Sequence, residues 1–406
     1  MPERPPTVGT PSLLRAINAR TILEHIQRTG PVSRAQVARD SGLSKPTVSL
    51  GLTALLDADL VREVGRSSGR PGPSAVLYEL NPSAGWVVGI DVGRRRVRAA
   101  VADITGAVVA RRDEPARASS ARTLIGQIGA IAHGLAAEAG IGWDQVHHVT
   151  VGSPGVFEPT RGAVTLAPNL PGWGRQGLLL RLRDELGSRI GVENDVNLAA
   201  EGERWRGLAR GVRNFGFLSV GTGVGMGLVL DGKLYRGASG AAGEVGYLPI
   251  GADPYDRQVR RRGAFEEAVN GAAVVRAARA AGTGGSLTAK KIFGLARRGD
   301  PLATRVVEDE ASRIALGLAV VTAVVDLELV ILGGGIGGNA DLLLGPVERE
   351  LRALSPMRPR LATSALGDLK GGGDGALEDR VLAKGRDRQA GPHRGQRAQL
   401  PLDGGE

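Results

Sequence analysis

The stretch from residue 31 to residue 60 constrains the fold most, because it has the pattern of two short helices around a glycine turn. Ser33 can cap the first helix, and Gln36 lies three residues later, where a capping box requires it. Gly42 ends that helix, and Ser44 can cap a second one. The pattern predicts a helix-turn-helix. The alternative is an ordinary helical hairpin that serves only for packing.

The second helix has one apolar face, because its apolar residues recur at helical spacing. That face comprises Val48, Leu52, Leu55 and Leu56, and it leaves Lys45, Thr47, Ser49, Leu50 and Thr53 directed outward. A first turn rich in serine, lysine and threonine suits the DNA major groove, where phosphates are neutralised and base edges accept hydrogen bonds. The residues expected to contact DNA are Ser33, Arg34, Ser44, Lys45, Thr47 and Ser49.

The segments on either side of this stretch favour the same interpretation. Residues 13–28 place apolar side chains on one stripe and predict a supporting helix. Residues 60–80 alternate apolar and polar residues around a turn, which predicts a two-stranded wing. Arg66 and Arg70 lie near its tip and could enter a minor groove. A solvated loop is the alternative.

Composition limits the classes of protein. A chain of 406 residues is long for one core, so two or three domains are expected. The net charge of +10 favours nucleic acid only weakly, because the arginines are spread along the chain. The absence of cysteine excludes disulfides and thiolate zinc sites. No signal peptide is expected, and the apolar run 314–325 is too short to span a bilayer, so a cytoplasmic protein without a membrane partner is predicted.

Beyond a linker at residues 81–83, two similar glycine-containing hairpins begin at Trp86 and Phe215. This repetition predicts an α/β domain of two duplicated lobes with a cleft between them. Helices are expected at residues 123–140, 177–186, 264–281, 301–325 and 340–354, and a buried strand at 330–332. After residue 365 the chain is rich in glycine and charge, so residues 366–406 are predicted to be a disordered or divergent tail.

Several motifs in this order resemble the ROK family. They include GPVSRAQVARDSGLSKPTVS, VGSPGV, LAPNLPGW, VENDVNLAAEGE, GTGVGMG, AAGEVGY and GAFEE. The resemblance implies an N-terminal winged helix-turn-helix at residues 12–82. It implies a two-lobed, actin-like ATPase (ribonuclease-H-like) ROK domain at residues 86–365.

The resemblance also implies a sugar site. In the kinases of the family, the aspartate that matches Asp195 takes a proton from a sugar hydroxyl, and the matching asparagine binds the sugar. Two family glutamates hold sugar hydroxyls. The residues implied for ligand binding here are Asn169, Asn194, Asp195, Glu244, Tyr247 and Glu266. The alternative for Asn194 and Asp195 is that they only cap the following helix.

Two departures from the family pattern bear on activity. Tyr247 replaces the zinc-binding histidine, and Arg257, Val259 and Ala264 occupy the positions of the cysteine cluster, so no metal and no cofactor are expected. The family turn Asp-x-Gly-Gly-Thr-Lys becomes Asp91-Val-Gly-Arg-Arg-Arg, ending at Arg96. Arginine in place of the second glycine is expected to compromise both the tight turn and the approach of a phosphate to the backbone.

The sequence therefore predicts a transcriptional regulator, a repressor rather than an enzyme, that binds operator DNA as a homodimer or a dimer of dimers. A sugar or sugar derivative in the cleft is expected to modulate its DNA affinity. Asp195 would then be a vestigial base. One alternative is an ATP-dependent sugar kinase with an added DNA-binding domain. Another is a ligand-independent DNA-binding protein that keeps the lobes for dimerisation.

Overall fold

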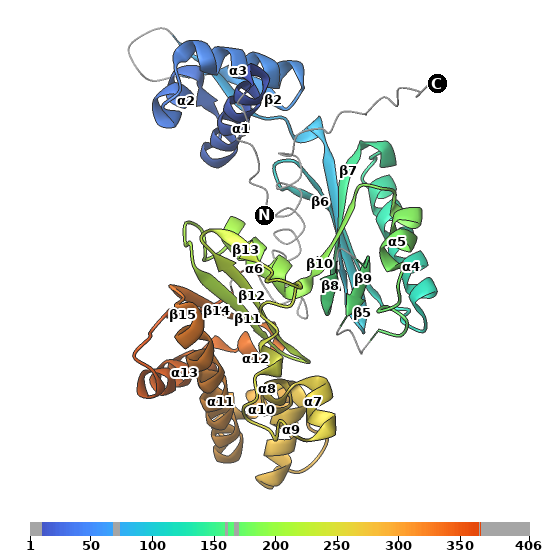
Figure 1. Cartoon of the computed structure of the whole chain (residues 1–406), viewed down its shortest axis with the longest axis vertical. Helices are drawn as coiled ribbons and strands as arrows, with labels where there is room; N and C mark the ends of the chain where they lie inside the picture. Colours follow the sequence, from blue (N-terminus) through green and yellow to red (C-terminus); the bar gives the residue numbers. More distant parts are fainter. Residues whose placement is uncertain (1–9, 68–73, 159–160, 166–169, 365, 367–406) are drawn as a thin grey trace, which may run out of the picture.

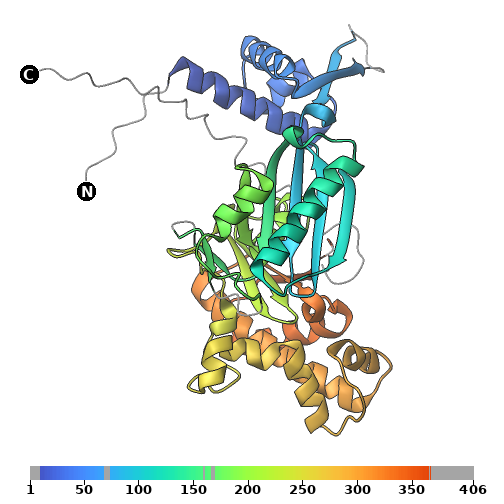
Figure 2. The ribbon, with the colours of Figure 1, turned by 90° about the vertical axis from the view of Figure 1, so that its right-hand side faces the viewer.

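The computed structural model describes residues 10–67, 74–158, 161–165, 170–364 and 366, and it arranges them in three parts (Figure 1). An N-terminal domain lies at one end of the molecule beside a first lobe, and a second lobe lies at the other end (Figures 1 and 2). The predicted tail falls outside the described residues, apart from residue 366.

The N-terminal domain is a winged helix-turn-helix. Its helices are α1 (Pro11–Thr29), α2 (Arg34–Ser41) and α3 (Lys45–Asp57), and its strands are β1 (Val32–Ser33), β2 (Val61–Arg66) and β3 (Val76–Leu80), in the order β1-β3-β2. Helix α3 approaches α1 closely because residue 51 is glycine, where a Cβ would collide with the side chain of Ile22. Val37, Val48 and Leu52 are fully buried in the same core. The predicted helix-turn-helix and wing are confirmed.

The first lobe is a five-stranded sheet covered by two helices. Its strands are β4 (Trp86–Val92), β5 (Arg96–Asp103), β6 (Val108–Pro115), β7 (Val146–Ser153) and β10 (Ile190–Asn194), in the order β6-β5-β4-β7-β10. Helices α4 (Ala121–Glu138) and α5 (Leu178–Leu186) lie against one face of this sheet, in front of the strands in Figure 2. A small hairpin, β8 (Val156–Glu158) and β9 (Ala163–Thr165), follows β7.

The second lobe repeats this plan. Its strands are β11 (Phe215–Val220), β12 (Val224–Leu230), β13 (Lys233–Tyr235), β14 (Leu329–Gly333) and β15 (Arg360–Thr363), in the order β13-β12-β11-β14-β15. In both sheets three antiparallel strands are followed by two parallel ones. The prediction of two duplicated lobes is therefore confirmed.

Helices cover both faces of the second sheet. Helix α6 (Asp195–Trp205) packs on one face. The remaining helices are α7 (Arg257–Arg262), α8 (Ala264–Val269), α9 (Gly271–Ala280), α10 (Ala289–Arg297), α11 (Pro301–Val325), α12 (Gly334–Gly337) and α13 (Ala340–Leu354). The core on the other face is built from α8 to α11 and α13, with fully buried Phe265, Phe293 and Ile314.

One helix prediction was wrong in its extent. Residues 264–281 were expected to form a single helix, but the chain has two, α8 and α9, separated at Asn270. Asn270 has extended backbone angles, and its side chain accepts the Ala273 N–H, so it caps α9 instead of continuing α8. Within the described ranges, none of the helices is long and apolar enough to cross a membrane.

Candidate functional site

The junction of the two lobes carries the residues expected to bind a ligand. Strand β10 ends at Asn194, and Asp195 begins α6 directly after it. The Asn194 side chain accepts the N–H groups of Val196 and Asn197 at 2.8 and 3.1 Å and donates to the Gly155 carbonyl at 3.1 Å. Asn194 is thus a helix cap, and these hydrogen bonds fix the orientation of its amide; its role in ligand binding stays a prediction.

An ion pair between a buried glutamate and a half-exposed arginine holds this junction. Glu193 is buried at the end of β10, and Arg236, which follows β13 of the other lobe, donates to its carboxylate at 2.9 and 2.8 Å. The other carboxylate oxygen of Glu193 accepts the Asn194 backbone N–H and the Asn197 amide, both at 3.1 Å. The start of α6 is therefore tied to both lobes.

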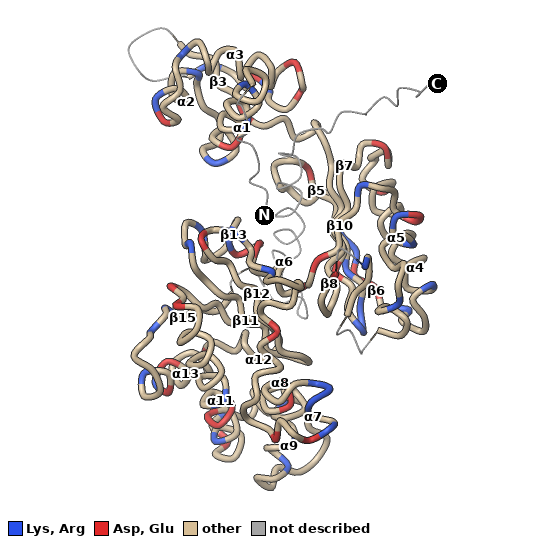
Figure 3. The backbone as a smooth tube through the Cα atoms, viewed as in Figure 1, with Lys and Arg blue, Asp and Glu red and all other residues tan. Residues whose placement is uncertain are grey.

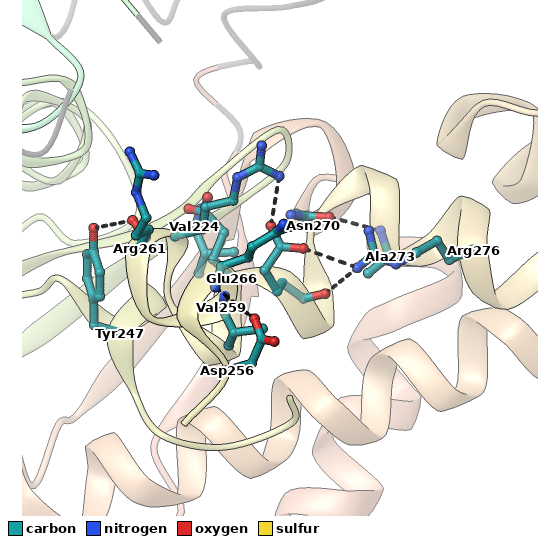
Figure 4. Close-up of polar contacts among 12 residues, drawn as sticks. Val224, Tyr247, Asp256, Val259, Arg261, Glu266, Asn270, Ala273 and Arg276 are labelled. Carbon is teal, nitrogen blue, oxygen red and sulfur yellow. Dashed lines mark hydrogen bonds and ion pairs between the residues drawn. The ribbon is translucent and has the colours of Figure 1, made fainter. Parts of the chain in front are cut away.

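Glu244 and Glu266 come from the second lobe, and Glu244 lies within electrostatic reach of both Asp195 and Glu266. Burial, followed by the charges of Asp195 and Glu266, raises the pKa of Glu244 from 4.5 to about 7. Glu266 accepts the Val224 N–H at 2.9 Å, and burial is the main cause of its raised pKa (Figure 4). The structure therefore brings together three carboxylates, which can accept hydrogen bonds from vicinal hydroxyls.

Backbone packing positions Glu244. The preceding residue, Gly243, has a φ of 88°, and its carbonyl accepts the Met226 N–H of β12 at 2.8 Å. A Cβ at Gly243 would collide with the Met226 carbonyl, so only glycine allows this loop to lie on the strand.

Tyr247 lies at the rim of the same site, with 38% of its surface exposed. Its hydroxyl donates to the Arg261 carbonyl at the limiting distance of 3.5 Å (Figure 4). Burial and the charges of Glu244 and Glu266 raise the pKa of Tyr247, so the hydroxyl remains protonated at neutral pH and can donate.

The family's zinc does not fit this segment. Tyr247, Arg257, Val259 and Ala264 supply no thiolate or imidazole. Hydrogen bonds order the segment instead: Asp256 caps α7 by accepting the N–H groups of residues 258 and 259 at 2.8 and 3.0 Å. The arginines of α7 make this helix strongly basic (Figure 3).

The expectation for the first phosphate turn needs a correction. The turn is tight despite its arginines, because the Gly93 N–H donates to the Arg96 carbonyl at 2.9 Å and neither Arg94 nor Arg95 has a positive φ. Asp91, at the start of this turn, has Arg98 within 3.5 Å across the hairpin. Sequence reasoning missed this pair, although counting back across a four-residue turn places residue 98 opposite residue 91.

Two of the residues expected to contact DNA cap helices in the N-terminal domain. Ser33 accepts the Gln36 N–H at 3.3 Å, and Ser44 accepts the Thr47 N–H at 3.2 Å. The Ser44 hydroxyl also lies 2.8 Å from the Thr47 hydroxyl. Lys45, at the first turn of α3, is exposed.

Arg34 is held by its own domain. It donates to the Tyr78 hydroxyl at 3.0 Å and to the Ser49 hydroxyl at 3.4 Å, and its guanidinium lies 5.9 Å from the centre of the Tyr78 ring. Tyr78, on the wing strand β3, was not expected to take part. These contacts fix Arg34 beside the outward face of α3.

That face also carries an exposed leucine. Leu50 is 69% exposed, whereas Val48 and Leu52 on the same helix are fully buried. On the wing, Arg66 donates to the Ser74 carbonyl at 3.4 Å. Two of the residues expected to bind, Arg70 for DNA and Asn169 for the ligand, lie outside the described residues.

The fold and the site define a two-lobed protein of the actin-like ATPase class that carries a winged helix-turn-helix. The chain belongs to the ROK family, whose model matches residues 87–363. It is 25% identical over 350 residues to a xylose repressor of Caldicellulosiruptor bescii, covering 83% of this chain and 88% of that protein. It is 29% identical over 298 residues to a glucokinase of Halalkalibacterium halodurans, covering 69% and 88% of the two proteins.

A solved structure has the same overall fold. It is described as a ROK family transcriptional regulator that is a homologue of the E. coli MLC protein. The TM-score is 0.76 at 22% identity, and the match covers 93% of this chain and 98% of that one. The match therefore extends over both the N-terminal domain and the two lobes.

Proposed function

We propose that this protein is a sequence-specific DNA-binding transcriptional regulator, a repressor, whose DNA affinity is modulated by a sugar bound at the junction of its lobes. The observation that carries the proposal is the coexistence of a complete winged helix-turn-helix with the group formed by Asp195, Glu244 and Glu266. The similarity to xylose repressors over most of the chain supports it.

The ligand would be bound through its hydroxyls. Glu244 and Glu266 accept from vicinal hydroxyls, Tyr247 donates to a ring or hydroxyl oxygen, and Asp195 accepts at the position where a kinase has its base. With Arg98 beside Asp91, Asp195 serves as a ligand contact without phosphoryl transfer.

The DNA would be bound by α3 in the major groove. Lys45 neutralises a phosphate, and Arg34, together with the exposed face of α3, contacts the groove. We propose that the protein acts in the cytoplasm as a homodimer, so that two copies of α3 contact half-sites one helical turn apart.

The direct test is selection of DNA from a random pool by the purified protein, repeated with D-xylose, D-glucose and other hexoses and pentoses. We expect one enriched sequence whose affinity changes with one of the sugars. Failure to enrich any sequence, with or without sugars, would refute the proposal.

Substitution of Asp195 tests whether the ligand binds at the junction of the lobes. Asp195→Ala is expected to leave DNA affinity unchanged and to abolish the sugar response, while Asp184→Ala, an exposed aspartate on α5, behaves as wild type. An unchanged response in Asp195→Ala would place the ligand elsewhere.

A sugar kinase is the second candidate, since glucokinases are among the relatives and Asp195 is present. The pair formed by Asp91 and Arg98 argues against it. Formation of a sugar phosphate from ATP would decide in its favour.

A further inference from the structure

Helix α6 reaches from the candidate ligand site to a turn of the first lobe that contacts the N-terminal domain. It begins with Asp195 at the three carboxylates, and its 11 residues span about 16 Å. Its last residue, Trp205, and the following Arg206 contact the first lobe. One helix therefore begins at the candidate ligand site and ends beside a turn that contacts the DNA-binding domain.

The body of α6 is packed on the second lobe. Ala199 and Ala200 share a core with Phe215 and Val229 of the central strands β11 and β12. The approach is close, since a Cβ at Gly227 of β12 would lie 2.7 Å from the Ala200 Cβ. Helix α6 is therefore expected to follow the second lobe when that lobe moves.

The end of α6 holds a turn of the first lobe. Arg206 donates to the carbonyls of Thr105 and Gly106 at 3.2 and 3.3 Å, in the turn between β5 and β6. Its guanidinium lies 4.7 Å from the centre of the Trp205 ring, and Trp205 packs against Val87 and Ala102. The arginine is therefore oriented by stacking as well as by two hydrogen bonds.

The turn itself is stiff. The Asp103 carboxylate accepts the Thr105 N–H at 2.7 Å, the Thr105 hydroxyl at 2.6 Å and the Ala107 N–H at 3.1 Å. Ile104, inside this turn, packs against the hydrophobic core of the N-terminal domain. A displacement of the turn would therefore disturb a contact with the core of the winged helix-turn-helix.

We propose that α6 couples the ligand site to the DNA-binding domain through Arg206 and the turn that carries Ile104. Arg206 is a positioning residue in this mechanism, since it contacts neither ligand nor DNA. The inference rests on the proposed function and adds the route by which the ligand acts. When the second lobe closes on the ligand, α6 moves with it. Arg206 then displaces the turn through its hydrogen bonds to Thr105 and Gly106.

The test measures coupling as the ratio of DNA dissociation constants with and without saturating sugar. The probes are D-xylose and D-glucose, and the DNA is the sequence selected from the random pool. In Arg206→Ala we expect the ratio to fall at least about fivefold toward one, while sugar affinity and sugar-free DNA affinity each change less than about threefold. Arg206→Lys keeps the charge but cannot span both carbonyls, so its ratio should be intermediate.

The matched control is Arg210→Ala, which removes the same charge from an exposed position four residues later. A wild-type coupling ratio in Arg206→Ala would overturn the route while leaving the proposed function intact. Absence of any sugar effect on wild-type DNA binding would overturn both.

A second measurement needs no variant. The N–H groups of Thr105 and Ala107 are bonded to Asp103, so their hydrogen exchange reports on the turn in the intact wild-type protein. We expect the responding sugar to change their exchange rates at least about fivefold. Unchanged exchange, at a sugar concentration that alters DNA affinity, would overturn the route.

Discussion

The guanidinium of Arg98 lies 3.5 Å from the carboxylate of Asp91, across the first hairpin of the first lobe. Both side chains are mostly buried, so the pair is poorly screened by solvent. Asp91, at the start of the first phosphate turn, therefore has a cationic partner on the neighbouring strand, and this partner also lies 3.4 Å from Asp113.

The protein should not phosphorylate sugars. With ATP, Mg²⁺ and either D-glucose or D-xylose, the protein should form no sugar phosphate above the background without protein. Arg98→Ala removes the partner of Asp91, so any turnover gained in this variant would assign the lack of activity to that pair. Detection of product by NMR in the wild type would contradict this prediction.

Sugar affinity should depend on pH through Glu244. Its pKa of about 7 lies above the ordinary value, so the acceptor carboxylate forms only as pH rises through 7. Between pH 6 and pH 8 we expect affinity to rise by up to about tenfold, as measured by calorimetry. Glu244→Gln should bind weakly and lose this dependence, while Glu308→Gln, exposed on α11, should retain it.

Glu310 should lower stability at high pH. It is fully buried in α11, and burial raises its pKa to about 8, although Arg313 at 3.6 Å opposes this shift. Because the folded pKa lies above the unfolded value of 4.5, its contribution to stability is lost as pH rises from about 4.5 to 8. Glu310→Met should stabilise the protein by about 2–4 kcal/mol at pH 8.5 and less at pH 5.5, as measured by urea unfolding. Identical pH dependence in both proteins would contradict this role.

Lys45 should contact phosphate. Lys45→Ala is expected to weaken binding to all DNA sequences alike and to reduce the slope of log affinity against log salt by about 1. Lys290→Ala, on α10 of the second lobe, is the control. Loss of discrimination at a single base pair would instead assign Lys45 to base recognition.

Leu50 should contact a thymine methyl group, because it is an exposed apolar side chain on the face of α3 that would enter the groove. Leu50→Ala should weaken the free energy of binding to the selected sequence by about 1 kcal/mol. Replacing one thymine with uracil, which lacks the methyl group, should weaken binding by the wild type by a similar amount and should not weaken binding by the variant. Equal penalties in the two proteins, measured by fluorescence anisotropy, would exclude the contact.

Local sequence signals predicted much of this fold. Ser33, Gly42 and Ser44 mark helix boundaries through their own side chains or backbone freedom, so the helix-turn-helix could be located without tertiary information. The two glycine hairpins likewise indicated a duplicated sheet. Asn270 was the exception, because an asparagine between two helical patterns can either continue a helix or begin a new one.

Contacts that depend on tertiary placement were not accessible from the sequence. The pair of Tyr78 with Arg34 joins residues 44 positions apart, and Arg206 reaches a turn about 100 positions earlier. The roles of the site residues remain predictions. Asn194 illustrates the difficulty, since the same side chain can cap a helix and face a ligand.

The contribution of Ile104 to the core of the N-terminal domain limits how freely that domain can be exchanged. A graft that transplants only residues 12–82 onto another ROK scaffold would lose the contact with Ile104 and would meet whatever residue the recipient carries at this turn. Chimeric regulators built from this chain should therefore include the segment 103–107 as part of the transferred unit.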